Sequence, residues 1–212
     1  FIFCFLIPLP SHQKTAMETP KKRLSIHDFI EFKALPVALM AMMISFCYAS
    51  IMSFIATFAE SKHMLAYASL FFAVFAISMM SLRPITGKIY DRKGPNAVVY
   101  PALILFSVGL AVLAFIDSVA GLLFSAVLIG MGFGSAQPCL QTISIQRSPK
   151  NRIGHATSTY FTFYDLGIAI GSIILGMIIA DTSYAVAYSI CAVLVLISLI
   201  YYKFMVASKP IS

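Results

Sequence analysis

Six long apolar segments constrain the fold of this chain more than any other feature. They cover approximately residues 36–59, 65–83, 96–116, 119–145, 154–180 and 184–206, and short polar groups separate them. A helix needs about 20 apolar residues to cross a ~30 Å hydrocarbon core, and each segment is close to that length or longer. We therefore predict an all-α membrane protein, a bundle of six transmembrane helices.

Composition and charge agree with a protein that lies in the lipid bilayer. Of 212 residues, 60% are hydrophobic and 11% are charged, and the mean hydropathy is +0.91. Fourteen of the 15 Lys and Arg residues fall in 11–35, 83–95, 146–155 and 203–212, and the other is Lys62. Basic loops face the cytoplasm, so these loops and both ends of the six-helix unit are predicted to be cytoplasmic. No nucleic-acid motif accompanies the net charge of +7, and no nucleic-acid partner is expected.

The segment 83–95, Arg-Pro-Ile-Thr-Gly-Lys-Ile-Tyr-Asp-Arg-Lys-Gly-Pro, is the most informative part of the sequence, and we call it the signature segment. Its dense charge, two glycines and two prolines predict a tight charged hairpin between two membrane helices. Asp91 precedes a new apolar run, where it could cap or face a helix start. Gly87 and Gly94 would permit close backbone approach, and Arg92 could bridge helix ends. Two roles are possible for this segment. Its contacts would latch the cytoplasmic side in one conformation, or its charges would only orient the hairpin in the membrane.

The pattern R-P-x-x-G-x-x-x-D-R-x-G-P resembles the cytoplasmic signature loop of the major facilitator superfamily. The matching positions, between the second and third predicted spans, are Arg83, Pro84, Gly87, Asp91, Arg92 and Gly94. The runs 130–138 and 163–167 are similar to segments of bacterial drug-efflux members. The resemblance implies two six-helix halves with the substrate held between them.

By that resemblance the chain is the C-terminal half of such a transporter. Residues 1–9 are apolar but span only roughly 14 Å as a helix, so we interpret them as the end of a truncated preceding transmembrane helix. Residues 10–35 would be a basic cytoplasmic linker, 36–206 the six-helix bundle and 207–212 a cytoplasmic tail. The chain would need the missing N-terminal half, or a second copy, as its partner.

Asp165 is the sharpest candidate for a functional residue, because it is an acid deep within a predicted span. An ionised carboxylate there costs about 2.5–3.5 kcal/mol on insertion scales, so the side chain should face protein or water and take up a proton readily. We therefore predict that Asp165 couples protons to transport.

Small and polar side chains recur at helical spacing on three spans and could converge on a cavity. Ser158 and Thr162 share a face with Asp165, and Gln137 and Gln141 lie on the fourth span. We predict that these residues, with Tyr48 on the first span, line a substrate path. Gln137, Gln141 and Tyr48 could equally bond to neighbouring helices, and the glycines in these stripes are better explained by helix packing.

Motifs for catalysis and for cofactor or metal binding are not found in the sequence. It contains no Gly-x-Gly-Asp, no phosphate-binding G-x-x-x-x-G-K and no G-x-S-x-G, and the cysteines and histidines do not form a metal-binding pattern. We expect no enzyme activity, no cofactor and no metal.

We predict a proton-coupled exporter of small amphipathic compounds in a bacterial plasma membrane. Export and the kind of substrate come only from the resemblance. An uptake carrier for a sugar, organic acid or other nutrient would use the same fold, and a non-transporting half from a truncated gene is a further alternative.

Overall fold

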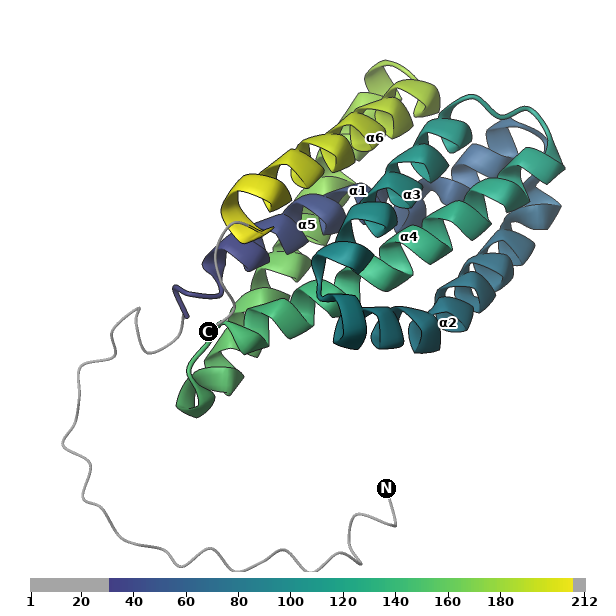
Figure 1. Cartoon of the computed structure of the whole chain (residues 1–212). Coiled ribbons are helices and arrows are strands. Elements are labelled where there is room, and N and C mark those ends of the chain that lie inside the picture. The colour runs from purple at the N-terminus through teal and green to yellow at the C-terminus, as the bar shows by residue number, and fades with distance from the viewer. Residues whose placement is uncertain (1–30, 208–212) are drawn as a thin grey trace, which may run out of the picture.

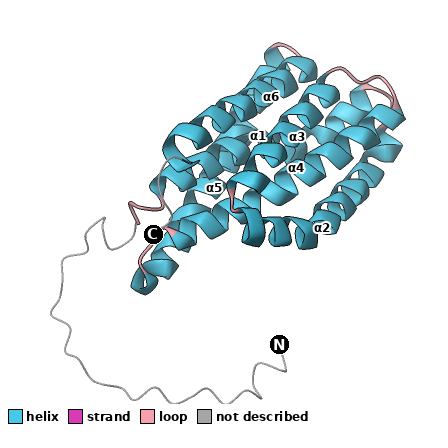
Figure 2. Cartoon of the chain, viewed as in Figure 1, coloured by secondary structure: helices cyan, strands magenta, loops and turns pink. Residues whose placement is uncertain are grey.

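The computed structural model describes residues 31–207, and in this range it forms a bundle of six long helices (Figure 1). The long helices are α1 (Leu35–Ser61), α2 (Ala68–Lys93), α3 (Asn96–Ala114), α4 (Val119–Gln146), α5 (Ile153–Asp181) and α6 (Tyr184–Tyr201). Short 3₁₀ turns, η3 (Leu65–Tyr67) and η4 (Lys150–Arg152), precede α2 and α5, and a π-helical segment, η5 (Tyr202–Ala207), continues α6. Figure 2 shows that only short loops join the helices of this range. The predictions for residues 1–30 and 208–212 lie outside the described residues.

Six helices are long and apolar enough to cross a membrane within the described range, which confirms the predicted fold class. Local sequence explains several helix starts. Pro36 lies in the first turn of α1, where its missing N–H costs no hydrogen bond. The hydroxyl oxygens of Ser118 and Ser183 accept hydrogen bonds from the backbone N–H groups of Gly121 and Val186, which caps α4 and α6.

The second helix differs from the prediction, because α2 does not end near residue 83. It continues to Lys93, so most of the signature segment is helical, with Pro84 inside the helix. The turn between α2 and α3 is therefore limited to Gly94 and Pro95, and the charges of the segment lie on α2. Charged residues are compatible with a helix that extends out of the hydrocarbon, since its internal hydrogen bonds satisfy the backbone on both sides of the boundary.

Gly94 ends α2 for a conformational reason rather than by permitting close approach. Its φ is +80° and its ψ is 174°, a region that residues with a Cβ rarely adopt. Its N–H donates to the carbonyl of Tyr90 at 2.9 Å. A Cβ added at Gly94 or at Gly87 would have no atom of the described bundle within 4 Å, so neither glycine makes the predicted close approach within this bundle.

The helices pair in a two-fold pattern. The most extensive contacts join α1 with α5 and α3 with α4, followed by α2 with α4 and α3 with α6. If α1–α3 are exchanged for α4–α6, the pair of α1 and α5 becomes the pair of α4 and α2, as two related three-helix repeats would require.

Burial differs between the helices, and this difference determines where the bundle is open. About half of the most apolar stretch of α1, α3 and α4 is buried, compared with 17% for α2 and α5. The core contains large buried side chains such as Phe106 and Tyr188. The helices α2 and α5 thus flank the bundle and each leaves most of one face uncovered by the described residues.

Candidate functional site

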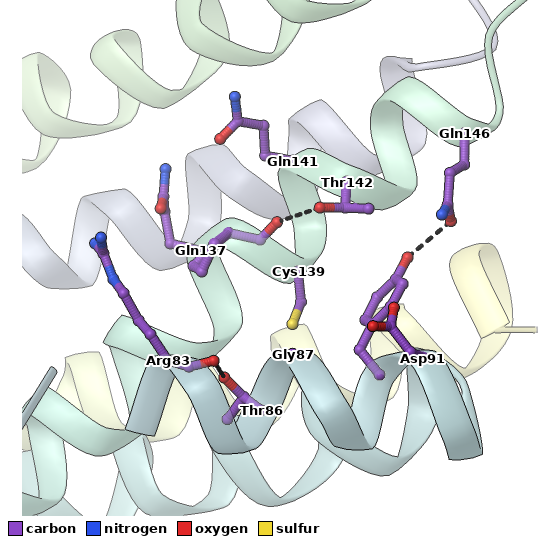
Figure 3. Close-up of a pocket in the computed structure, with 11 residues that line it drawn as sticks. Arg83, Thr86, Gly87, Asp91, Gln137, Cys139, Gln141, Thr142 and Gln146 are labelled. Atoms are coloured by element: carbon purple, nitrogen blue, oxygen red, sulfur yellow. Dashed lines mark hydrogen bonds between the residues drawn. The ribbon is translucent and has the colours of Figure 1, made fainter. Parts of the chain in front are cut away.

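The C-terminal halves of α2 and α4 line an open cavity of about 470 Å³ (Figure 3). It lies at the end of the bundle where α2, α4 and α6 finish and α3 and α5 begin, which we call the basic end. The lining side chains are mostly polar: Arg83, Thr86, Gly87, Tyr90, Asp91, Gln137, Pro138, Cys139, Gln141, Thr142 and Gln146. The cavity therefore brings residues of the signature segment together with Gln137 and Gln141 of α4. The sequence pattern assigned the signature segment and these glutamines to separate sites.

Some polar side chains of the cavity wall are hydrogen-bonded within the bundle, and others are not. The hydroxyl of Tyr90 donates to Oε1 of Gln146 at 2.8 Å and joins α2 to α4. The hydroxyl of Thr142 donates to the backbone carbonyl of Pro138 at 2.9 Å. The carboxamides of Gln137 and Gln141 make no hydrogen bond to the described residues, and Figure 3 shows them without such a bond. These two side chains can therefore donate to or accept from a bound molecule.

Asp91 lies in the last turn of α2, which corrects the expectation that it would cap or face the start of the next helix within this half. The following helix, α3, begins at Asn96 with Pro95 at its N-cap, and no side chain caps it. Asp91 and Arg92 are both exposed. No hydrogen bond or ion pair joins either side chain to another residue of the described range, so the latch stays a prediction.

One face of α5 carries Ser158, Thr162 and Asp165, and all three side chains are exposed on the bundle. The spacing of four and then three residues places them in one stripe. The opposite face is packed: an added Cβ at Gly167 would lie 2.4 Å from the carbonyl oxygen of Met42 on α1. Close packing on one side and exposure on the other make the Asp165 stripe a surface feature of this half.

Asp165 does not line the cavity between α2 and α4, so the structure does not join the predicted proton site to the two glutamines in one cavity. A link between α4 and α5 comes from Tyr160, which the sequence did not single out. Its buried side chain donates a hydrogen bond to the backbone carbonyl of Gln137 at 3.0 Å. Its position five residues before Asp165 was no distinctive signal, because tyrosines recur throughout the chain.

Tyr48 packs among the helices and does not line the cavity at the basic end. Its ring is half-buried and stacks on Phe133 of α4, with ring centroids 4.0 Å apart and an interplanar angle of 9°. A second stacking contact joins it to Phe75 of α2 at 6.1 Å. These contacts hold α1 against α2 and α4, and Tyr48 is not part of the lining of the cavity at the basic end.

Comparison with known proteins decides the family. The sequence pattern of the Major Facilitator Superfamily matches residues 1–172. The chain belongs to the major facilitator superfamily. Its family and its relatives are membrane transporters and not enzymes, and the six apolar helices make it an integral membrane protein.

Curated relatives in this superfamily are similar at low identity. An uncharacterized MFS-type transporter, YwoD of Bacillus subtilis strain 168, is 26% identical over 147 residues, covering 66% of this chain and 32% of that protein. The multidrug resistance protein MdtG of Escherichia fergusonii is 26% identical over 129 residues, or 61% of this chain and 32% of MdtG. The Dickeya zeae MdtG is 27% identical over the same length. The chain thus spans about a third of the length of these relatives.

Solved major facilitator structures share the fold. A POT family transporter in complex with 5-aminolevulinic acid has a TM-score of 0.69 at 18% identity, covering 81% of this chain and 37% of that one. Another, in complex with a thioalcohol-conjugated peptide, has a TM-score of 0.70 at 18% identity, covering 84% and 40%. At this identity the likeness shows the fold alone.

Proposed function

We propose that this chain is one six-helix half of a proton-coupled transporter that exports small amphipathic compounds by alternating access. The observation that carries the proposal is the exposure of Asp165, with Ser158 and Thr162, on α5, the helix that packs its other face tightly on α1. A carboxylate in the middle of a membrane helix is costly in lipid. It is stable where a second half or water covers it, and there it can bind and release a proton.

The second half would pack against the open faces of α2 and α5 and complete the path. Transporters of this superfamily have two six-helix halves around one substrate site, and this chain spans about a third of its relatives. The cavity with Gln137 and Gln141 would then lie on the substrate path at the basic end. The exposed signature residues Asp91 and Arg92 would meet the second half and close that end, which we propose is cytoplasmic. We refer below to this chain joined to a second six-helix half as the two-half transporter.

Drug-type substrates are proposed from the relatives named for multidrug resistance. Amphipathic compounds suit a cavity that offers amide groups from Gln137 and Gln141, a carboxylate from Asp91 and apolar surface from Pro138. These groups bind through general polarity rather than through one exact geometry, as a transporter of varied compounds requires.

Transport in vesicles tests the proposal. Membrane vesicles with an imposed pH gradient are loaded with a panel of cationic dyes and small metabolites, and the 212-residue chain is compared with the two-half transporter. We expect gradient-driven movement of dyes by the two-half transporter and none by the chain alone. Movement of metabolites but not dyes would contradict the substrate class, and transport by the chain alone would require a homodimer. Equal rates with and without the gradient would contradict proton coupling.

A further inference from the structure

The polypeptide just before α1 is tied to the beginning of α5. The backbone N–H of Glu31 donates to Oγ1 of Thr159 at 3.0 Å, and its carboxylate oxygen Oε2 pairs with Nε of Arg152 at 2.5 Å. The other carboxylate oxygen accepts a hydrogen bond from the backbone N–H of Lys33 at 3.3 Å. We call Glu31, Arg152 and Thr159 the linker anchor.

Burial on the Glu31 side distinguishes this contact from an exposed ion pair, although the Arg152 side chain is 31% exposed. Glu31 is only 6% exposed, and Thr159 is 3% exposed. Acidic side chains are rarely buried so completely unless they are paired, because the cost of removing the charge from water must be offset by hydrogen bonds and an opposite charge. The anchor supplies both. By contrast, the ion pair of Lys62 and Asp117 at the other end of the bundle is exposed.

The position of the anchor connects it to the helix that carries Asp165. Thr159 lies six residues before Asp165 on α5, roughly 9 Å along the helix axis. Further along, α5 is locked to α1 by the close approach at Gly167 and at Gly171, where an added Cβ would lie 2.7 Å from the carbonyl oxygen of Phe46. The chain leading into α1, α1 itself and α5 are therefore joined at the basic end and again in the middle of the bundle.

We propose that Glu31 is a positioning residue that makes the segment before α1 and the helix α5 move as one body during transport. This inference rests on the proposed function. If residues 10–35 connect the two halves, any displacement of that connection reaches α5 directly through the linker anchor. The Asp165 stripe then changes its exposure together with the linker, and proton binding is coupled to the movement between halves.

Proteolysis of the 212-residue chain tests the anchor without any transport assay. Lys33 is exposed, so a lysine-specific protease, which does not cut after arginine, can reach it once the surrounding backbone leaves its anchored position. We expect Glu31→Gln to speed cleavage after Lys33 by about tenfold or more, since a hydrogen-bonded charge is lost from a buried site. Exchange of the two charges, Glu31→Arg with Arg152→Glu, should restore protection.

Cleavage after the exposed Lys62 at the opposite end is the control and should not change. Equal cleavage after Lys33 in the wild type and Glu31→Gln would overturn the anchor.

Transport by the two-half transporter tests the positioning role with the same variants. We expect Glu31→Gln to lower the maximal rate about tenfold while leaving KM within about twofold, because the substrate cavity is not touched. The charge exchange should recover most of the rate at equal amounts of protein in the membrane. Altered cleavage with an unchanged transport rate would overturn the positioning role and leave a structural contact. If the wild type itself does not transport, the proposed function and the positioning role both fail, whereas the cleavage result still decides whether the anchor exists.

Discussion

Asp165→Asn abolishes accumulation against a gradient in the two-half transporter while downhill exchange of substrate continues. A gradient of one pH unit provides about 1.4 kcal/mol per proton, which supports about tenfold accumulation when one proton is exchanged for each substrate molecule. Asparagine has the size of aspartate but cannot bind and release a proton in this pH range. The accumulation ratio in the variant should therefore fall to about 1.

The measurement is the steady-state ratio of a transported dye inside and outside vesicles at several imposed pH gradients. Asp181→Asn is the matched control, because Asp181 is a second exposed carboxylate on α5 but lies at the end of the helix. It should leave the ratio unchanged. A ratio in Asp165→Asn that still rises with the pH gradient as in the wild type would remove Asp165 from the coupling step.

Gly132→Ala severely destabilises the bundle, because α3 and α4 touch at this glycine. An added Cβ would lie 2.4 Å from the backbone nitrogen of Phe106 and 2.6 Å from the carbonyl oxygen of Ala102. Backbone atoms cannot move aside as a flexible side chain can, so the two helices must separate. Overpacking of this kind costs about 1–3 kcal/mol or more, and we expect the unfolding temperature in detergent to fall by roughly 5–10 °C.

The control for this prediction is Gly154→Ala in the first turn of α5. No atom of the described bundle lies within 4 Å of a Cβ added there, and alanine favours helix over glycine. Its unfolding temperature should be equal to that of the wild type or higher. Equal stability of Gly132→Ala and Gly154→Ala would mean that α3 and α4 do not pack as closely as described.

The sequence predicted the number of membrane helices, because a membrane requires long apolar segments whatever their tertiary contacts. It failed at the signature segment, where Pro84, Gly87 and the charges suggested a loop. The local preference of these residues was overridden, since α2 continues to Lys93 and ends at Gly94, which has a positive φ. Prolines and glycines are thus weaker markers of helix ends near a membrane boundary than in soluble proteins.

The arrangement of the candidate site could be predicted only in part. Helical spacing correctly placed Ser158, Thr162 and Asp165 on one face of α5, because that geometry is local. The cavity that joins Asp91 with Gln137 and Gln141 depends on the pairing of α2 with α4, which the sequence pattern does not specify. Glu31 was simply one charge in a basic segment, and only its burial against α5 distinguishes it.

We propose that the Asp165 face of α5 borders a water-filled path between two halves, and thiol labelling detects such a path. Thr162→Cys is introduced one turn from Asp165 in the two-half transporter, in a background without Cys4, Cys47, Cys139 and Cys191. Ile104→Cys is the matched control, since Ile104 is 48% exposed but lies on α3.

Both variants are treated with a membrane-impermeant maleimide. With the pH held constant on the side of the maleimide, we predict that Thr162→Cys is labelled at a rate that changes with the pH gradient, while Ile104→Cys stays unlabelled in lipid. Equal resistance of both cysteines under every gradient would mean that the Asp165 face of α5 does not border water.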